Sequence, residues 1–186
     1  MTIRSTAVLS LLASFTIPAP LWAKGDMVLV EIKGASLKSP IQITDPRIEE
    51  FNIWVGPGIS VGDGISSQKE ETKGFIIDWQ AGVAGQRPIG LQHYEVSFYA
   101  GCRTPERWNS NVRDCLAEKP RLAYVVSYDY DPSSKRGFVY LPGKGDQFYY
   151  VNIGSIGHGS RDGHWFFATT SWEDFVRPLI ANAQNH

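Results

Sequence analysis

The chain has 186 residues, with 18 lysines and arginines against 19 aspartates and glutamates, so its formal net charge is −1. A chain with this balance of charges is not expected to have the clustered basic surface that binding to nucleic acid or anionic lipid requires. The length fits a single folded domain.

The first 23 residues have the three parts of a secretory signal. Arg4 is the only charged side chain in this segment, and an apolar stretch follows at residues 7–17. That stretch is shorter than the roughly 20 apolar residues that span a bilayer. We expect cleavage after Ala23, which places residues 24–186 outside the cytoplasm, in the periplasm or secreted, as one β-rich domain without a membrane span.

Beyond residue 26, apolar and polar side chains alternate with a period of two, which is typical of half-buried strands. Turn residues, mainly glycine, proline and aspartate, separate these stretches. Short strands at this spacing predict a mainly β fold, an antiparallel sandwich or barrel-like sheet. The expected strands lie at residues 28–33, 41–43, 53–55, 75–79, 94–99, 122–130, 137–141, 147–153 and 164–168.

Two helices are expected to pack on this sheet. A short one near 45–52 begins at an aspartate followed by proline, a favourable helix start. A C-terminal one near 171–183 has Ser171 as the expected cap and Pro178 inside, where proline should kink or split it. Its apolar side chains recur at helical spacing at Trp172, Phe175, Val176, Leu179 and Ile180.

The two cysteines, Cys102 and Cys115, both follow the signal segment. Disulfides persist outside the cytoplasm, so a structural disulfide between them is expected. Closing a loop of this size stabilises a fold by about 3 kcal/mol on the chain-entropy model. A redox-active pair is the alternative, although such pairs usually lie close together at a helix start.

Residues 30–46 combine a strand, a Gly-x-x-Leu turn and the motif Pro-Ile-x-Ile-Thr-Asp-Pro, followed by Phe51. Together with residues 128–132, 140–143 and 177–179, this stretch resembles a family of secreted bacterial proteins of unknown function. The resemblance implies export and a β-rich fold, and it implies no activity or catalytic residue.

His158 and His164 flank a short loop that contains Asp162. Across a hairpin these side chains could supply two or three metal ligands, although a zinc site needs a further ligand. The serine of Gly159-Ser160 lacks the spacing of a nucleophile elbow. Two solvated histidines are the simpler interpretation, and no cofactor is expected.

Aromatic residues make up 12% of the chain. Several fall on neighbouring expected strands, where one shared face could bind sugar, peptide or another flat ligand. Packing in a β-rich core is the simpler explanation and the favoured one. The candidates for a ligand face are Tyr124, Tyr128, Tyr130, Tyr140 and Tyr150, with Phe148 beside them.

The sequence therefore predicts an exported, non-enzymatic module that binds an envelope protein, a peptide or a glycan, or is otherwise associated with the envelope. The alternatives are a hydrolase or metal-dependent enzyme centred on His158, Asp162 and His164, and a purely structural role.

Overall fold

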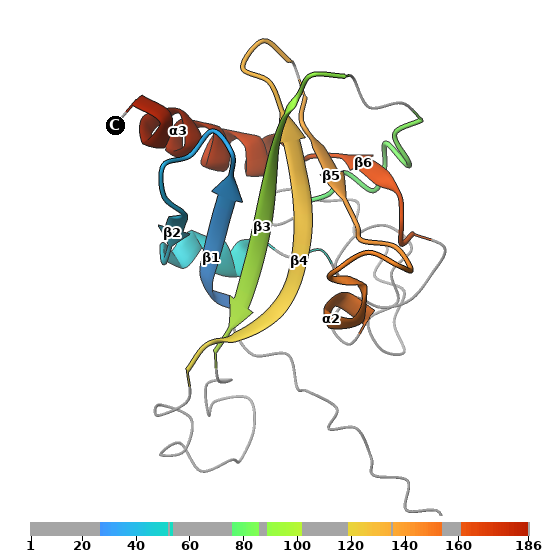
Figure 1. Ribbon diagram of the computed structural model, residues 1–186, viewed down its shortest axis with the longest axis horizontal. Coiled ribbons are helices and arrows are strands. Elements are labelled where there is room, and N and C mark those ends of the chain that lie inside the picture. Colours follow the sequence, from blue (N-terminus) through green and yellow to red (C-terminus); the bar gives the residue numbers. More distant parts are fainter. Residues whose placement is uncertain are drawn as a thin grey trace, which may run out of the picture.

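The computed structural model describes residues 27–51, 53, 76–85, 89–101, 119–134, 136–153 and 161–185. In this part of the chain, six strands form one open antiparallel sheet in the order β2-β1-β3-β4-β5-β6 (Figure 1). The strands are β1 (Met27–Gly34), β2 (Ile41–Ile43), β3 (Gln92–Ala100), β4 (Arg121–Tyr130), β5 (Phe138–Tyr140) and β6 (Trp165–Phe167). The helical elements are η1 (Pro46–Glu50), α2 (Tyr149–Ile153) and α3 (Thr170–Asn185).

The predicted mainly β class, the antiparallel pairing, the short helix after Asp45 and the C-terminal helix are confirmed, and the sheet is not closed into a barrel. The expected signal segment and both cysteines lie outside the described residues, as do the expected strand positions 54 and 55. None of the described helices is long and apolar enough to cross a membrane.

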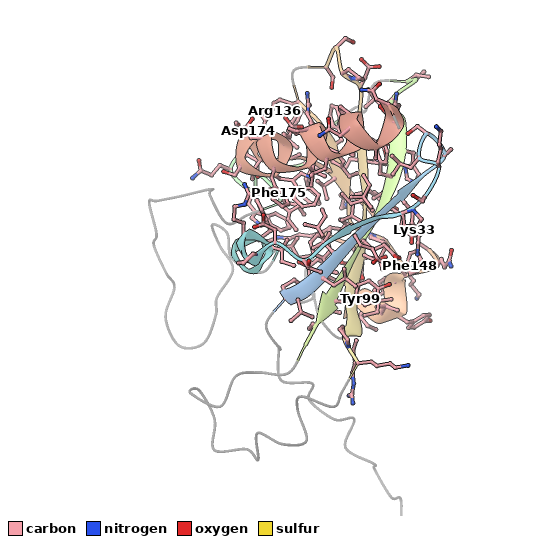
Figure 2. All side chains as sticks on the ribbon, turned by 90° about the vertical axis from the view of Figure 1, so that its left-hand side faces the viewer. Lys33, Tyr99, Arg136, Phe148, Asp174 and Phe175 are labelled. Atoms are coloured by element: carbon pink, nitrogen blue, oxygen red, sulfur yellow. The ribbon has the colours of Figure 1, made fainter. Side chains whose placement is uncertain are left out.

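One face of the sheet, here called the core face, packs against η1 and α3. In Figure 1, α3 passes behind the strands, and in Figure 2 it lies with η1 on the opposite side of the sheet from α2. The strands contribute alternate residues to this core, because successive side chains point to opposite faces. The buried strand residues of the core include Val30, Ile32, Tyr94, Val96, Phe98, Tyr124, Val126, Tyr128, Tyr130, Val139 and Phe166.

Two irregularities shift the predicted alternation at the strand ends. The pairing of β1 with β3 shifts between Met27 and Leu29, and Val28 is 37% exposed although Val30 is fully buried. A second shift, beside Phe98, places Leu122 outside the core at 38% exposure. A bulge adds one residue to one strand, so the side chains beyond it change face.

Side chains cap the first residues of both η1 and α3. Asp45 accepts the Arg47 backbone N–H at the start of η1, and hydrogen bonds from the Arg47 side chain and backbone lower the pKa of Asp45 to about 2. At the start of α3, the Thr169 hydroxyl accepts the Trp172 N–H at 3.1 Å. The cap of α3 is therefore Thr169 and not Ser171, and the helix is not split at Pro178.

Residues 147–153 were expected to form a strand, and this prediction is wrong: Tyr149–Ile153 form helix α2. The Asn152 side chain reaches the backbone of Val125, accepting its N–H at 2.8 Å and donating to its carbonyl at 2.7 Å. Strand β5 pairs with β4 only at residues 127–129. The Asn152 amide thus takes the place of a neighbouring strand at Val125, which local strand propensity does not reveal.

Replacing Asn152 with alanine is expected to lower the free energy of unfolding by about 2–3 kcal/mol, because a buried N–H and a buried carbonyl both lose their partner. Urea unfolding followed by circular dichroism measures the change. Asn182→Ala, at an exposed position of α3, is the control and should change stability by less than about 0.5 kcal/mol. Equal stability of the two variants would contradict the strand-substituting role of Asn152.

The expected strand at 75–79 is represented in the described residues by isolated bridges rather than a strand. Ile77 pairs with Ala168 and Val83 pairs with Phe166, at the free edge of β6. These bridges occupy backbone groups of the edge strand that would otherwise be available to another chain.

Candidate binding face

The face of the sheet opposite α3, here called the open face, carries a row of side chains that crosses five strands. Strand pairing places Lys33 opposite Glu95, Glu95 opposite Ser127, Ser127 opposite Tyr140, and Tyr140 opposite Trp165. We call these five residues the cross-strand row. Lys33 is exposed and the other four are partly exposed. Four strand spacings make the row about 19 Å long.

The aromatic end of the row is a fixed pair of rings. The centroids of Tyr140 and Trp165 are 5.0 Å apart, with the planes inclined by 34°. The Tyr140 hydroxyl donates to the Asp146 carboxylate at 2.8 Å, and the same carboxylate oxygen accepts the Gly143 N–H at 2.7 Å. Burial and this bond to Asp146 raise the pKa of the Tyr140 hydroxyl. These contacts hold the Tyr140 ring in one position.

Two loops support this end of the row by direct backbone contact. Gly163 donates to the Leu141 carbonyl at 2.8 Å, and Leu141 donates to the His164 carbonyl at 3.2 Å. A Cβ atom on Gly143 would lie 2.6 Å from the Gly163 Cα, so the close approach requires glycine. These contacts extend the pairing of β5 and β6 and fix the spacing of the two aromatic rings.

The charged end of the row carries both signs. Lys33 forms an ion pair with Glu31 at 2.5 Å. Hydrogen bonding to Lys33 is the largest cause that lowers the pKa of Glu31. Glu95 lies on the open face because successive side chains of β3 alternate between the two faces. Ser127 adds a hydroxyl between the charged and the aromatic side chains. The row thus combines charged, hydroxyl and aromatic groups along one line.

A second polar pair lies on the open face, one step along the strands from the row. His93 and Asp129 are directly opposite each other in β3 and β4, and His93 Nδ1 lies 2.6 Å from Asp129 Oδ1. The Asp129 side chain is fully buried, whereas 60% of the His93 side chain is exposed.

The five tyrosines that sequence analysis proposed as a ligand face occupy different environments. Tyr124, Tyr128 and Tyr130 lie on the core face and are at most 2% exposed, so they cannot present their rings to a ligand. Tyr150 is on α2 and 76% exposed. Only Tyr140 lies in the cross-strand row. Burial raises the pKa of the Tyr124 hydroxyl and, together with the Glu173 charge, that of Tyr128.

Of the proposed metal ligands, His158 lies outside the described residues. Asp162 is partly exposed and His164 is exposed, both in the turn before β6. Among the residues that the structure describes, no group of three histidine, cysteine, aspartate or glutamate side chains is placed to hold a metal ion.

Sequence analysis missed Glu95, Ser127, Trp165 and the His93–Asp129 pair as members of one surface. The alternation within each strand already separates these residues from the core. Their proximity depends on which strands pair and in which register. This pairing involves segments far apart in the chain, so the residues next to each position do not reveal it.

Comparison with family models, with curated proteins and with solved structures finds no match for this chain.

Proposed function

We propose that the chain is an exported, non-enzymatic binding module and that its ligand is an oligosaccharide bound along the cross-strand row. The observation that carries the proposal is the alignment of Glu95, Ser127, Tyr140 and Trp165 on the open face. Export is supported by the signal features of the first 23 residues, and an exported protein meets the glycans of the cell envelope.

The chemistry of the row matches the surface of a sugar. A sugar ring has apolar faces and a polar edge, and an aromatic ring offers a broad apolar surface to such a face. Binding sites combine apolar walls with a few polar groups that fix orientation. Tyr140 and Trp165 supply the apolar part, and Ser127 and Glu95 supply hydrogen-bonding groups for hydroxyls.

The geometry favours an extended ligand over a compact one. The row is about 19 Å long and runs across the strands rather than into a cavity. Because the pairing of β5 with β6 and the Asp146 contact hold the rings, little side-chain ordering remains to oppose binding.

The test is isothermal titration of the purified exported protein with chitotetraose, cellotetraose and an unstructured octapeptide. Trp165→Ala is expected to weaken saccharide binding at least tenfold, because truncating an aromatic anchor removes much of the binding energy. Glu95→Gln should weaken binding about 3- to 10-fold, because it removes a charge-assisted hydrogen bond and preserves the shape of the side chain.

Asp174→Asn is the matched control, since Asp174 is exposed on α3, on the other side of the sheet (Figure 2). It should bind as the unmodified protein does. Binding of the peptide but of neither saccharide would contradict the proposed ligand class. Saccharide binding that is unaffected by Trp165→Ala and Glu95→Gln would contradict the proposed surface.

A further inference from the structure

The His93–Asp129 pair has the geometry of an oriented imidazole. With Asp129 ionised, its Oδ1 can only accept a hydrogen bond, and the donor across the 2.6 Å contact is then His93 Nδ1. The proton of the neutral ring then resides on Nδ1, and Nε2 keeps its lone pair. Asp129 is fully buried and its position is set by the β3–β4 ladder, so the direction of the ring is set as well.

The pair lies beside the cross-strand row. His93 precedes Glu95 by two residues on β3, and Asp129 follows Ser127 by two on β4, so all four side chains share the open face. The separation along each strand is about 7 Å. A saccharide chain on the row therefore passes within reach of the exposed imidazole.

We infer that His93 Nε2 accepts a hydrogen bond from a hydroxyl of the ligand and that Asp129 orients it for this contact; the ligand in this inference rests on the proposed function. Protonation of His93 converts Nε2 from an acceptor into a donor. Histidine is the side chain that ordinarily changes charge between about pH 5 and 8. The ligand hydroxyl that donates to the neutral ring must then turn and accept, so saccharide affinity changes as His93 becomes protonated.

Among the described residues, strand pairing places three charged groups near the imidazole: Asp129 opposite it on β4, Glu95 two residues along β3, and Lys33, which is paired with Glu95 on β1. The β5 residue opposite Asp129 is the uncharged Phe138.

The orientation is tested first without ligand, by long-range ¹H–¹⁵N NMR of the histidine rings. The expected result is a neutral His93 ring with its proton on Nδ1, and a smaller preference for this tautomer in Asp129→Asn. A neutral ring with its proton on Nε2 would overturn the inference, whatever the outcome for saccharides.

The ligand contact is tested by titrating the same protein with chitotetraose and cellotetraose between pH 5 and 8. Affinity should change by about 3- to 10-fold in step with the His93 protonation seen by NMR, the size expected when one hydrogen bond is altered. His93→Gln keeps an acceptor that does not titrate, so its affinity should be nearly independent of pH over this range.

The two proposals fail in different ways. If affinity does not change with His93 protonation while Trp165→Ala still weakens binding, the inference about His93 is wrong and the cross-strand row remains supported. If neither saccharide binds at any pH, the proposed function is wrong, and the ligand contact of His93 is wrong with it.

Discussion

Replacing Trp172 with alanine is expected to lower the free energy of unfolding by about 3–5 kcal/mol, the largest effect of any single truncation considered for this fold. The side chain is fully buried at the start of α3. Its ring contacts Phe51 at 5.6 Å, Tyr128 at 6.0 Å and Phe98 at 6.1 Å between centroids. Truncation therefore leaves a cavity between α3, η1 and the sheet.

Urea unfolding followed by circular dichroism measures this loss. Trp172→Phe retains most of the apolar contacts and should cost clearly less, so it reports on the site even if the alanine variant does not fold. Tyr150→Ala, at a position 76% exposed, should change stability by no more than about 0.5 kcal/mol. A loss below about 1 kcal/mol for Trp172→Ala would mean that the helix does not depend on this contact.

Replacing Glu173 with alanine is the second large expected effect, a loss of about 3 kcal/mol or more. Glu173 is a buried acid that accepts the backbone N–H of Gly137 and pairs with Arg177 at 3.0 Å. Tyr128 donates a long hydrogen bond to the same oxygen at 3.5 Å. Without the carboxylate, the buried Gly137 N–H loses its partner, and the partly buried Arg177 guanidinium loses its ion pair and keeps its hydrogen bond to the Ser134 carbonyl.

The neighbouring acid provides the matched control for Glu173. Asp174 is the next residue of α3, just beyond its first turn, and is exposed, so Asp174→Ala removes the same charge near the helix start without opening a buried network. It should cost less than about 1 kcal/mol, the usual value of an acid near a helix N-terminus. Losses of similar size for the two variants would assign the effect of Glu173 to its charge at the helix end rather than to its partners.

Gly137 shows why this network is tightly constrained. A Cβ atom at that position would lie 2.6 Å from Glu173 Oε1 and from Tyr128 Cε2. The carboxylate can therefore reach the backbone of the chain entering β5 only because the residue is glycine. This contact links the first turn of α3 to the sheet.

The sequence predicts the structure best where a strand or helix has a long local period. The alternation of Tyr94, Val96 and Phe98 on β3 is reproduced in their burial. The apolar stripe of α3 is reproduced as well, with Trp172 and Val176 fully buried. Both patterns are properties of one segment, and the burial of one face follows directly from the period.

The predictions from the sequence are wrong where a partner far away in the chain decides the local structure. Residues 149–153 have the composition of a strand, yet they form α2, in which Asn152 binds the backbone of Val125. Glu173 lies in a polar position of the predicted helix, yet it is buried because Gly137 and Arg177 supply its partners. Neither partner is recognisable from the neighbouring residues.

By itself, the sequence determined the mainly β class, the short helix after Asp45, the C-terminal helix and the residues that alternate toward one face. The tertiary structure decided the strand order, the register and therefore the open face, where Glu95, Ser127, Tyr140 and Trp165 become neighbours. The physical reason is that the period of a strand is a local property, whereas the pairing of strands depends on contacts between segments far apart in the chain.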